Sequence, residues 1–111
     1  MNQKQNIELI KKAFREKFPR SKIRFIKIHG SQYQESGLPD LMILVHMPAL
    51  SNWLSNLIYW VEIKRDWKDE PSELQKHNIK DLRLHGFRTA FIAGDEYKEN
   101  WQDEPRNLCY F

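Results

Sequence analysis

The sequence predicts an α/β protein with a central mixed β-sheet flanked by helices. Three patterns lead to this fold class: a helical periodicity over residues 3–18, strand-like segments between residues 22 and 64, and a second helical pattern followed by a strand at 88–93. A helix between two strands can serve as the crossover that joins parallel neighbours in one sheet. Because the 111 residues contain no internal repeat, low-complexity tract or linker, we expect a single domain over residues 1–111.

The first half of the chain predicts one helix and two strands. The helix over residues 3–18 carries apolar side chains at spacings of three and four, and Pro19 ends it. These apolar residues are Ile7, Ile10, Phe14 and Phe18. Residues 22–28 alternate polar and apolar side chains, which is typical of a half-buried strand. Residues 41–45 form a short apolar run that is typical of a buried strand.

The second half predicts a strand, a helix and a further strand. Residues 57–64 are rich in the aromatic and β-branched side chains that strands favour. Residues 72–85 follow as a helix, with Gly86 placed to adopt the left-handed conformation that often ends helices. Residues 88–93 return as a strand, whereas the pattern of the final stretch, 94–111, predicts no element.

Composition limits the classes of function. No apolar stretch approaches the ~20 residues that span a membrane, and residues 1–12 lack the apolar core of a signal peptide. The single cysteine, Cys109, excludes an intramolecular disulfide and a cysteine-rich zinc site. We therefore expect a soluble, cytoplasmic protein.

The net charge of +3 is distributed unevenly along the chain. Residues 1–27 carry nine Lys or Arg against two acidic residues, a balance of +7, whereas residues 28–111 have a balance of −4. This separation suits a polyanionic partner on one side and a cation site elsewhere, although a solvated charged helix explains it equally well. The bases that could contact a phosphate backbone are Lys11, Lys12, Arg15, Lys17, Arg20, Lys22, Arg24 and Lys27.

Three charged residues occupy strand positions where burial would be costly without a purpose. Asp40 precedes the strand at 41–45, and Glu62 and Lys64 lie near the end of the strand at 57–64. Because side chains alternate along a strand, Glu62 and Lys64 project to the same face, roughly 6–7 Å apart. If the two strands pair, two carboxylates and an ammonium group converge at one edge of the sheet.

Two carboxylates in such proximity repel each other, and a hard divalent cation removes the repulsion. Oxygen ligands suit Mg²⁺ or Mn²⁺, which can lower the pKa of a water molecule and stabilise charge on a phosphoryl oxygen. Lys64 would then orient or deprotonate the attacking water, or neutralise the developing charge. This pattern predicts phosphodiester hydrolysis, and the alternative is a surface salt bridge between Glu62 and Lys64.

Three short motifs occur in order along the chain: Gly-Leu-Pro-Asp at 37–40, Glu-Ile-Lys-Arg at 62–65, and Ser-x-x-Gln at 72–75. Together they resemble the motifs of the PD-(D/E)XK nuclease superfamily. More closely, the chain is similar to the small stand-alone VRR-NUC domains of phages and bacteria, over about residues 3–93. The resemblance implies a restriction-endonuclease-like core for the predicted α/β fold.

The resemblance also implies an endonuclease that acts on DNA and depends on Mg²⁺ or Mn²⁺. By it, Asp40 and Glu62 are metal ligands, together with the backbone carbonyl of Ile63. Lys64 is the catalytic lysine, and Gln75 orients water or phosphate.

Two positions leave alternatives open. Ser72 and Gln75 also match a helix capping box, in which the Gln75 side chain reaches back to the Ser72 amide. Members of the family usually carry a glutamate near the start of the first helix, where this chain has Gln3 on the apolar face. Glu8 is the nearest carboxylate, but an i,i+4 pair with Lys12 explains it better.

Analogy with stand-alone nuclease domains leads us to expect a structure-selective enzyme that acts as a homodimer. One active site cuts one strand, and a two-fold pair suits the symmetry of a four-way (Holliday) junction. The alternative is a non-catalytic nucleic-acid-binding module with a degenerate nuclease site, which the glutamine at the helix position supports. A sequence-reading restriction enzyme fits less well, because 111 residues leave no room for a dedicated recognition element.

Overall fold

The computed structural model describes residues 3–28, 37–47 and 56–108. The elements in these ranges are α1 (Gln3–Lys17), β1 (Lys22–Lys27), β2 (Leu41–His46), β3 (Asn56–Ile63), α2 (Glu73–Leu84), β4 (Arg88–Ala93), β5 (Glu96–Lys98) and β6 (Arg106–Asn107). The predicted bounds of both helices and of the first four strands agree with these to within one residue at each end. Neither of the two described helices has the length and apolarity needed to cross a membrane.

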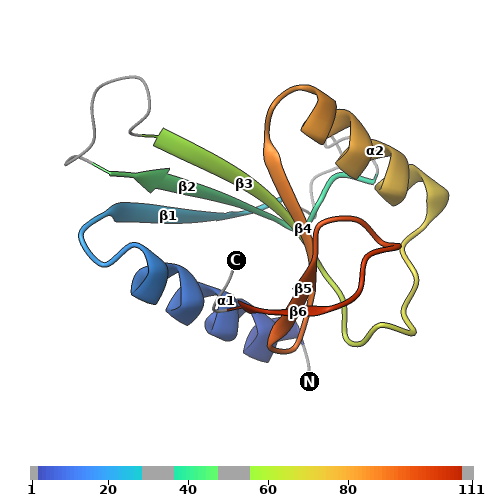
Figure 1. Ribbon diagram of the computed structural model, residues 1–111, viewed down its shortest axis with the longest axis horizontal. Coiled ribbons are helices and arrows are strands. Elements are labelled where there is room, and N and C mark those ends of the chain that lie inside the picture. Colours follow the sequence, from blue (N-terminus) through green and yellow to red (C-terminus); the bar gives the residue numbers. More distant parts are fainter. Residues whose placement is uncertain (1–2, 29–36, 48–55, 109–111) are drawn as a thin grey trace.

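The strands form one sheet whose spatial order is the sequence order β1 to β6. β3 and β4 run parallel, and the other neighbouring pairs are antiparallel. α1 and α2 lie on opposite faces of this sheet (Figure 1). The predicted α/β class, with a mixed sheet and flanking helices, is therefore confirmed.

The main hydrophobic core lies between α1 and the sheet. Phe14 of α1 packs edge-on against Tyr59 of β3, with ring centroids 4.8 Å apart. The buried members of this core are Ile10, Phe14, Leu41, Ile43, Val45, Tyr59, Val61, Ile63, Ala90, Ile92, Tyr97 and Leu108. The core residues that β2, β3 and β4 contribute alternate along each strand. The strand residues between them therefore project to the opposite face, which carries α2.

The register between β2 and β3 decides which side chains meet at one end of the sheet. Leu41 pairs with Val61, so the next step of this antiparallel pair brings Asp40 beside Glu62. Residues directly opposite each other on antiparallel strands project to the same face. Asp40 and Glu62 therefore share the α2 face, at the end where β2 begins and β3 finishes.

α2 connects the parallel strands β3 and β4, as its place between two strands predicted. Ser72 is its N-cap, and the Ser72 hydroxyl accepts a hydrogen bond from the Gln75 amide at 3.1 Å. Beyond the other end, Gly86 has a φ of +90° and donates its amide hydrogen to the carbonyl of Arg83 at 3.0 Å. The left-handed conformation predicted for this glycine is confirmed.

The chain after β4 extends the sheet, which the sequence analysis did not predict. β5 pairs with β4 and β6 pairs with β5, so the described residues form a sheet of six strands instead of the four expected. Trp101 packs against Phe91 and Trp67, with ring centroids 5.6 and 5.7 Å away. The Nζ of Lys98 lies 4.5 Å from the ring centroid of each tryptophan. These aromatic contacts hold the C-terminal segment against the sheet.

Candidate active site

Asp40 is fixed between three strands at the start of β2. Its backbone carbonyl accepts a hydrogen bond from the Ile28 amide at 2.8 Å, which ties it to the β1 side. Its Oδ2 accepts a hydrogen bond from the Ile63 amide at 2.9 Å, which ties its carboxylate to β3. The predicted pairing of the Asp40 strand with the Glu62 strand is therefore confirmed.

Glu62 is buried, with a relative exposure of 2%. Its Oε1 accepts a hydrogen bond from Gln75 Nε2 at 3.1 Å, whereas its buried Oε2 has no hydrogen-bond partner in the described part of the chain. Burial, and then the charge of Asp40, raise the pKa of Glu62 to about 8, against the lowering effect of Lys64. Both effects oppose the charged form of the carboxyl group. The pair therefore holds a proton or requires a cation.

The Lys64 ammonium group lies inside the same site. Its Nζ is 3.3 Å from Gln75 Oε1 and 3.8 Å from Glu62 Oε1. The salt bridge between Glu62 and Lys64 that was considered as an alternative is therefore present, but it is buried and not at the surface, because the Lys64 and Glu62 side chains are 9% and 3% exposed. A buried ion pair contributes little net stability, because desolvation of the two charges offsets their attraction. Stability alone therefore does not explain why this pair is present.

Gln75 serves the helix cap and the site with one side chain. Its Oε1 accepts hydrogen bonds from the Ser72 amide at 2.9 Å and from Lys64 Nζ at 3.3 Å, while its Nε2 donates to Glu62. Two donors at the amide oxygen and a carboxylate at the amide nitrogen fix its orientation. The capping box is confirmed, and the same residue also contacts both charged groups of the site.

Asn6, on α1, is a site residue that the sequence analysis missed. Its buried side chain donates from Nδ2 to the carbonyl of Lys64 at 2.9 Å and accepts from the Gly94 amide at 3.0 Å. One amide thus ties the first helix to the residues that follow β3 and β4. Asn6 precedes Ile10 and Phe14 at steps of four, on the most buried row of the helix. A polar residue on that row is the signal that could have identified it.

Gly37 allows the segment that leads to Asp40 to run against α2. Its φ is +80°, and a Cβ at this position would lie 2.6 Å from the Cγ of Leu74 and 2.9 Å from the Nδ2 of Asn78. Glycine is the residue that tolerates both this backbone conformation and so close an approach. The contact holds Asp40 beside the helix that carries Gln75.

The donor atoms at this corner fit a hard divalent cation. Asp40 and Glu62 provide carboxylate oxygens, and the Oε2 of Glu62 lacks a partner among the described residues. The Ile63 amide donates to Asp40, and the amide and carbonyl of one strand residue point to the same side of the strand. The carbonyl oxygen of Ile63 therefore also points to the Asp40 side. No group of three or more His, Cys, Asp or Glu side chains suited to a metal ion occurs within residues 3–28, 37–47 and 56–108. A cation here would be held by two carboxylates, one carbonyl and water, a set that Mg²⁺ accepts.

Glu8 does not belong to the site. Its side chain is 65% exposed and its carboxylate lies 3.8 Å from the Nζ of Lys11. The predicted pair with Lys12 is therefore wrong, because Glu8 pairs with the residue three positions ahead, which is also a neighbour on a helix surface. The side chain of Gln3, the other candidate for the helix glutamate, lies outside the described residues.

Comparisons of the chain with protein-family models, with curated proteins and with solved structures give no significant match. The resemblance to VRR-NUC domains therefore depends on the motifs alone. The case for a function rests on the geometry around Asp40 and Glu62.

Proposed function

We propose that this chain is a Mg²⁺- or Mn²⁺-dependent DNA endonuclease with a PD-(D/E)XK-type core, similar to the small VRR-NUC domains. The observation that carries the proposal is the meeting of the half-buried Asp40 with the buried Glu62 at one corner of the sheet, where the pKa of Glu62 rises to about 8. Such a pair destabilises the fold unless a proton or a cation neutralises it. A catalytic cation gives the arrangement a use.

Each residue of the site has a distinct part in this proposal. A divalent cation held by Asp40, Glu62 and the carbonyl of Ile63 would stabilise charge on a phosphoryl oxygen and make a water molecule more acidic. Lys64 presents its ammonium group to the same space, where it stabilises negative charge on the phosphate or orients the attacking water. Gln75 holds both Glu62 and Lys64 by hydrogen bonds, so its part is to position them.

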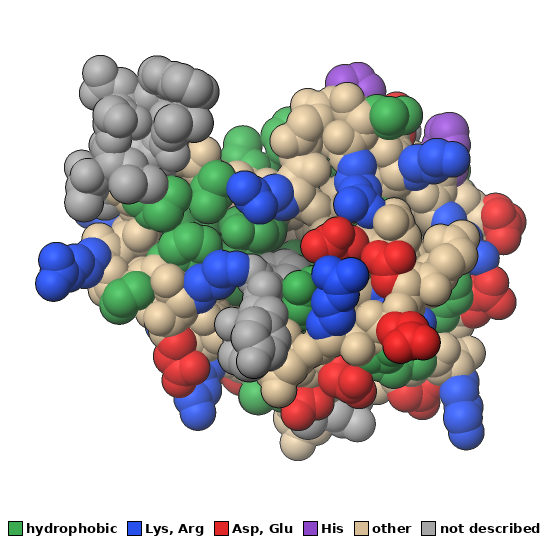
Figure 2. Space-filling view, in the orientation of Figure 1, with side chains coloured by type: hydrophobic (Ala, Val, Ile, Leu, Met, Phe, Trp, Pro, Cys, Tyr) green, Lys and Arg blue, Asp and Glu red, His purple; other side chains and the backbone are tan. Residues whose placement is uncertain are grey.

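A surface suited to DNA continues from the site along the same face of the sheet. Arg24 of β1 lies opposite Leu44 of β2, and Leu44 lies opposite Ile58 of β3, so these three side chains project to the same face. Ile58 and Glu62 are four residues apart on β3, so this is also the face of Glu62. A groove of about 440 Å³ lies here, with Lys22 and Arg24 in its lining. Figure 2 shows hydrophobic side chains gathered beside Lys and Arg side chains over the strands. Phosphates of a duplex could contact these bases while one strand reaches Glu62.

We further propose a branched DNA substrate, a homodimeric enzyme and a cytoplasmic location. One active site of this kind cuts one strand, so the symmetric cleavage of a four-way junction needs two copies of the chain. The preference for junctions comes from analogy with stand-alone nuclease domains, and the experiment below treats it separately from catalysis.

Cleavage of four matched DNA substrates tests the proposal. A four-way junction, a flap, a nicked duplex and an intact duplex are incubated with the protein and Mg²⁺ or Mn²⁺, and EDTA serves as the control. We expect the junction to be cut fastest, and we expect Lys64→Met and Asp40→Asn to abolish cutting while DNA binding remains. Equal rates on all four substrates would remove junction selectivity. Wild-type protein that cuts none of them with either ion contradicts the nuclease proposal.

A nucleic-acid-binding module without catalysis is the second candidate. Asn6 favours it, because α1 places a neutral amide at the ends of β3 and β4, and the nuclease resemblance leads us to expect a glutamate from this helix. Under this second proposal the wild-type protein binds branched DNA without cutting it. Asp40→Asn would then bind this DNA as the wild type does, and neither protein would cut it.

A further inference from the structure

The bases of β1 divide between the two faces of the sheet. β1 is an end strand and pairs with β2 alone among the described strands (Figure 1). Lys22 and Arg24 lie on the face of α2, where they line the groove proposed above for DNA. Lys27 lies opposite Leu41 of the main core, so its side chain projects from the other face, which α1 covers.

Two bases of α1 lie on the same face as Lys27, close to β1. Lys11 and Arg15 are four residues apart and are therefore neighbours on the helix surface. The Nζ of Lys11 and the Cζ of Arg15 each lie 5.8 Å from the centroid of the Phe25 ring on β1. Lys27 follows Phe25 by two residues, which places it on the same face about 7 Å farther along the strand. Lys11, Arg15 and Lys27 together are called the edge patch below.

The edge patch carries positive charge that its surroundings do not neutralise. Arg15 and Lys27 are exposed, and neither has an acidic partner within residues 3–28, 37–47 and 56–108. Lys11 lies 3.8 Å from Glu8, which offsets one charge and leaves the patch with a balance of +2. Uncompensated cations on one surface attract a polyanion and raise its rate of association.

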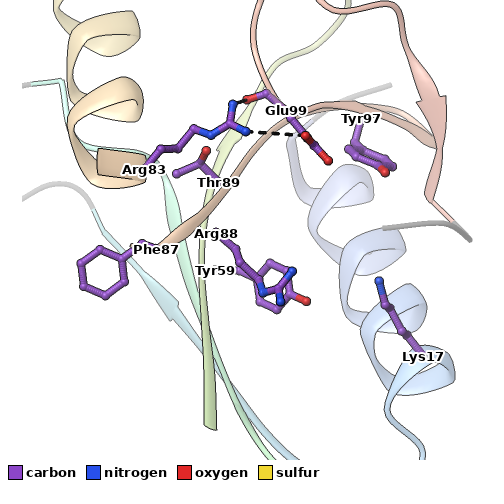
Figure 3. A pocket seen from close by; sticks show the side chains of 8 residues that line it. All are labelled: Lys17, Tyr59, Arg83, Phe87, Arg88, Thr89, Tyr97 and Glu99. Atoms are coloured by element: carbon purple, nitrogen blue, oxygen red, sulfur yellow. Dashed lines mark hydrogen bonds and ion pairs between the residues drawn. The ribbon is translucent and has the colours of Figure 1, made fainter. Parts of the chain in front are cut away.

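Bases in the second half of the chain are neutralised by acids more often. Arg83 lies 3.6 Å from the Glu99 carboxylate, a pair that Figure 3 shows, and Lys76 lies 2.5 Å from Glu70. Residues 17–28, in contrast, contain five Lys or Arg and no acidic residue. The edge of the sheet at β1 is therefore a positive surface on both of its faces.

A straight duplex that lies in the groove on the α2 face does not reach the edge patch. The groove presents Lys22 and Arg24 from one face of the sheet, whereas the edge patch projects from the opposite face. DNA has a persistence length of about 150 base pairs, so it is costly to bend a short duplex around the edge of a sheet. The edge patch therefore needs phosphates other than those of the duplex in the groove.

We propose that the edge patch binds the phosphate backbone of a second duplex arm, so that one chain contacts two arms of a branched DNA. The inference rests on the proposed DNA partner and does not depend on cleavage. Guanidinium and ammonium groups bind phosphate oxygens without reading the base sequence, which suits the recognition of shape. The six residues of β1 span roughly 17 Å, the length of about five base pairs, so an arm can lie along this edge. Two copies of the chain would contact all four arms of a junction.

Fluorescence anisotropy in EDTA tests this proposal with two probes, a four-way junction and a linear duplex that has the sequence of two of its arms. We expect Arg15→Gln and Lys27→Gln each to weaken junction binding roughly three- to tenfold and to reduce the slope of log affinity against log salt by about one. Their affinity for the linear duplex should change by less than about twofold, because that duplex occupies the groove on the α2 face. Arg24→Gln should weaken binding of both probes.

Lys12→Gln is the matched control. Lys12 is exposed on the side of α1 that lines a groove with Leu108, away from Phe25, so its loss should change the affinity for neither probe. Thermal unfolding of each variant confirms that it is folded.

The second-arm proposal is overturned if folded Arg15→Gln and Lys27→Gln bind the junction as the wild type does. It is also overturned if both probes lose affinity equally, because one duplex would then contact both faces. Poly-L-glutamate is a further probe: variants that lose it but keep the junction would identify an acidic protein as the partner instead. Wild-type protein that binds the junction but does not cut it with Mg²⁺ or Mn²⁺ contradicts the nuclease proposal alone, whereas protein that binds neither DNA contradicts both.

Discussion

Glu62 is an acidic residue whose surroundings oppose ionisation in two ways. Its side chain is buried, and Asp40 lies beside it, so the pKa of Glu62 rises to about 8. Lys64, with its Nζ 3.8 Å from Oε1, lowers the pKa without cancelling the other two effects. A fold with a neutral group here would therefore be more stable, and the cation that we propose for this site would relieve the same cost.

The stability of the metal-free protein should depend on the protonation of Glu62. An acid with a raised pKa holds its proton more tightly in the folded chain, so its contribution to the free energy of unfolding falls from about pH 4.5 to about pH 8 and stays low above that. Glu62→Gln removes this dependence. We expect the variant to be more stable than the wild type at pH 8, with a smaller difference at pH 5, as measured by urea denaturation in EDTA.

Glu104→Gln is the control for this measurement, because Glu104 is exposed. Its difference from the wild type should be small and independent of pH. If Glu62→Gln shows the same flat profile, the carboxyl pair is not coupled as described.

Asn6 joins α1 to the ends of two strands, so its effect belongs to the scale of elements. Asn6→Ala leaves the carbonyl of Lys64 and the amide of Gly94 without their side-chain partner in the interior. We expect the free energy of unfolding to fall by about 2–4 kcal/mol, and to change by less than about 0.5 kcal/mol for the exposed Lys12→Ala on the same helix. Urea denaturation followed by tryptophan fluorescence measures both. Equal effects would show that the bridge contributes nothing.

Gly37 and α2 form a second contact between elements. Gly37→Ala introduces backbone strain at positive φ and a clash with the Leu74 side chain. Gly86→Ala introduces backbone strain at positive φ without a clash, because nothing lies within 4 Å of the added Cβ. We expect Gly86→Ala to cost about 1 kcal/mol and Gly37→Ala about 1–3 kcal/mol more. Thermal unfolding compares the two variants. Adding Leu74→Ala to Gly37→Ala should recover part of the loss, and no recovery would place the cause in the backbone alone.

Periodicity predicted the elements that have long regular patterns, which are both helices and β1 to β4. β5 and β6 were missed because strands of three and two residues are too short to show alternation. The shared face of Glu62 and Lys64 was predictable because alternation is local. The contacts of Gln75 with these two residues depend on how α2 packs against the sheet, and the position of Asp40 depends on the register between β2 and β3. The spacing of residues in the sequence determines neither the packing of α2 nor this register.

At the scale of the whole molecule, the two faces of the sheet should contribute differently to DNA binding. Arg24 lies on the face of Glu62, and Lys12 lies on α1, which covers the opposite face. We expect Arg24→Gln to weaken duplex binding and to reduce the slope of log affinity against log salt by about one, and Lys12→Gln to do neither. Fluorescence anisotropy over a range of salt concentrations measures both. A larger effect of Lys12→Gln would place the DNA on the α1 face.

We propose above that Asp40 and Glu62 together hold a divalent cation, and calorimetric titration with Mn²⁺ tests this most directly. We expect one ion bound by the wild type, and binding roughly tenfold weaker or more in Asp40→Asn and in Glu62→Gln. Lys64→Met, which removes a cation from the same corner, should keep Mn²⁺ binding. Wild-type affinity for Mn²⁺ in both folded carboxylate variants would contradict a cation site at Asp40 and Glu62.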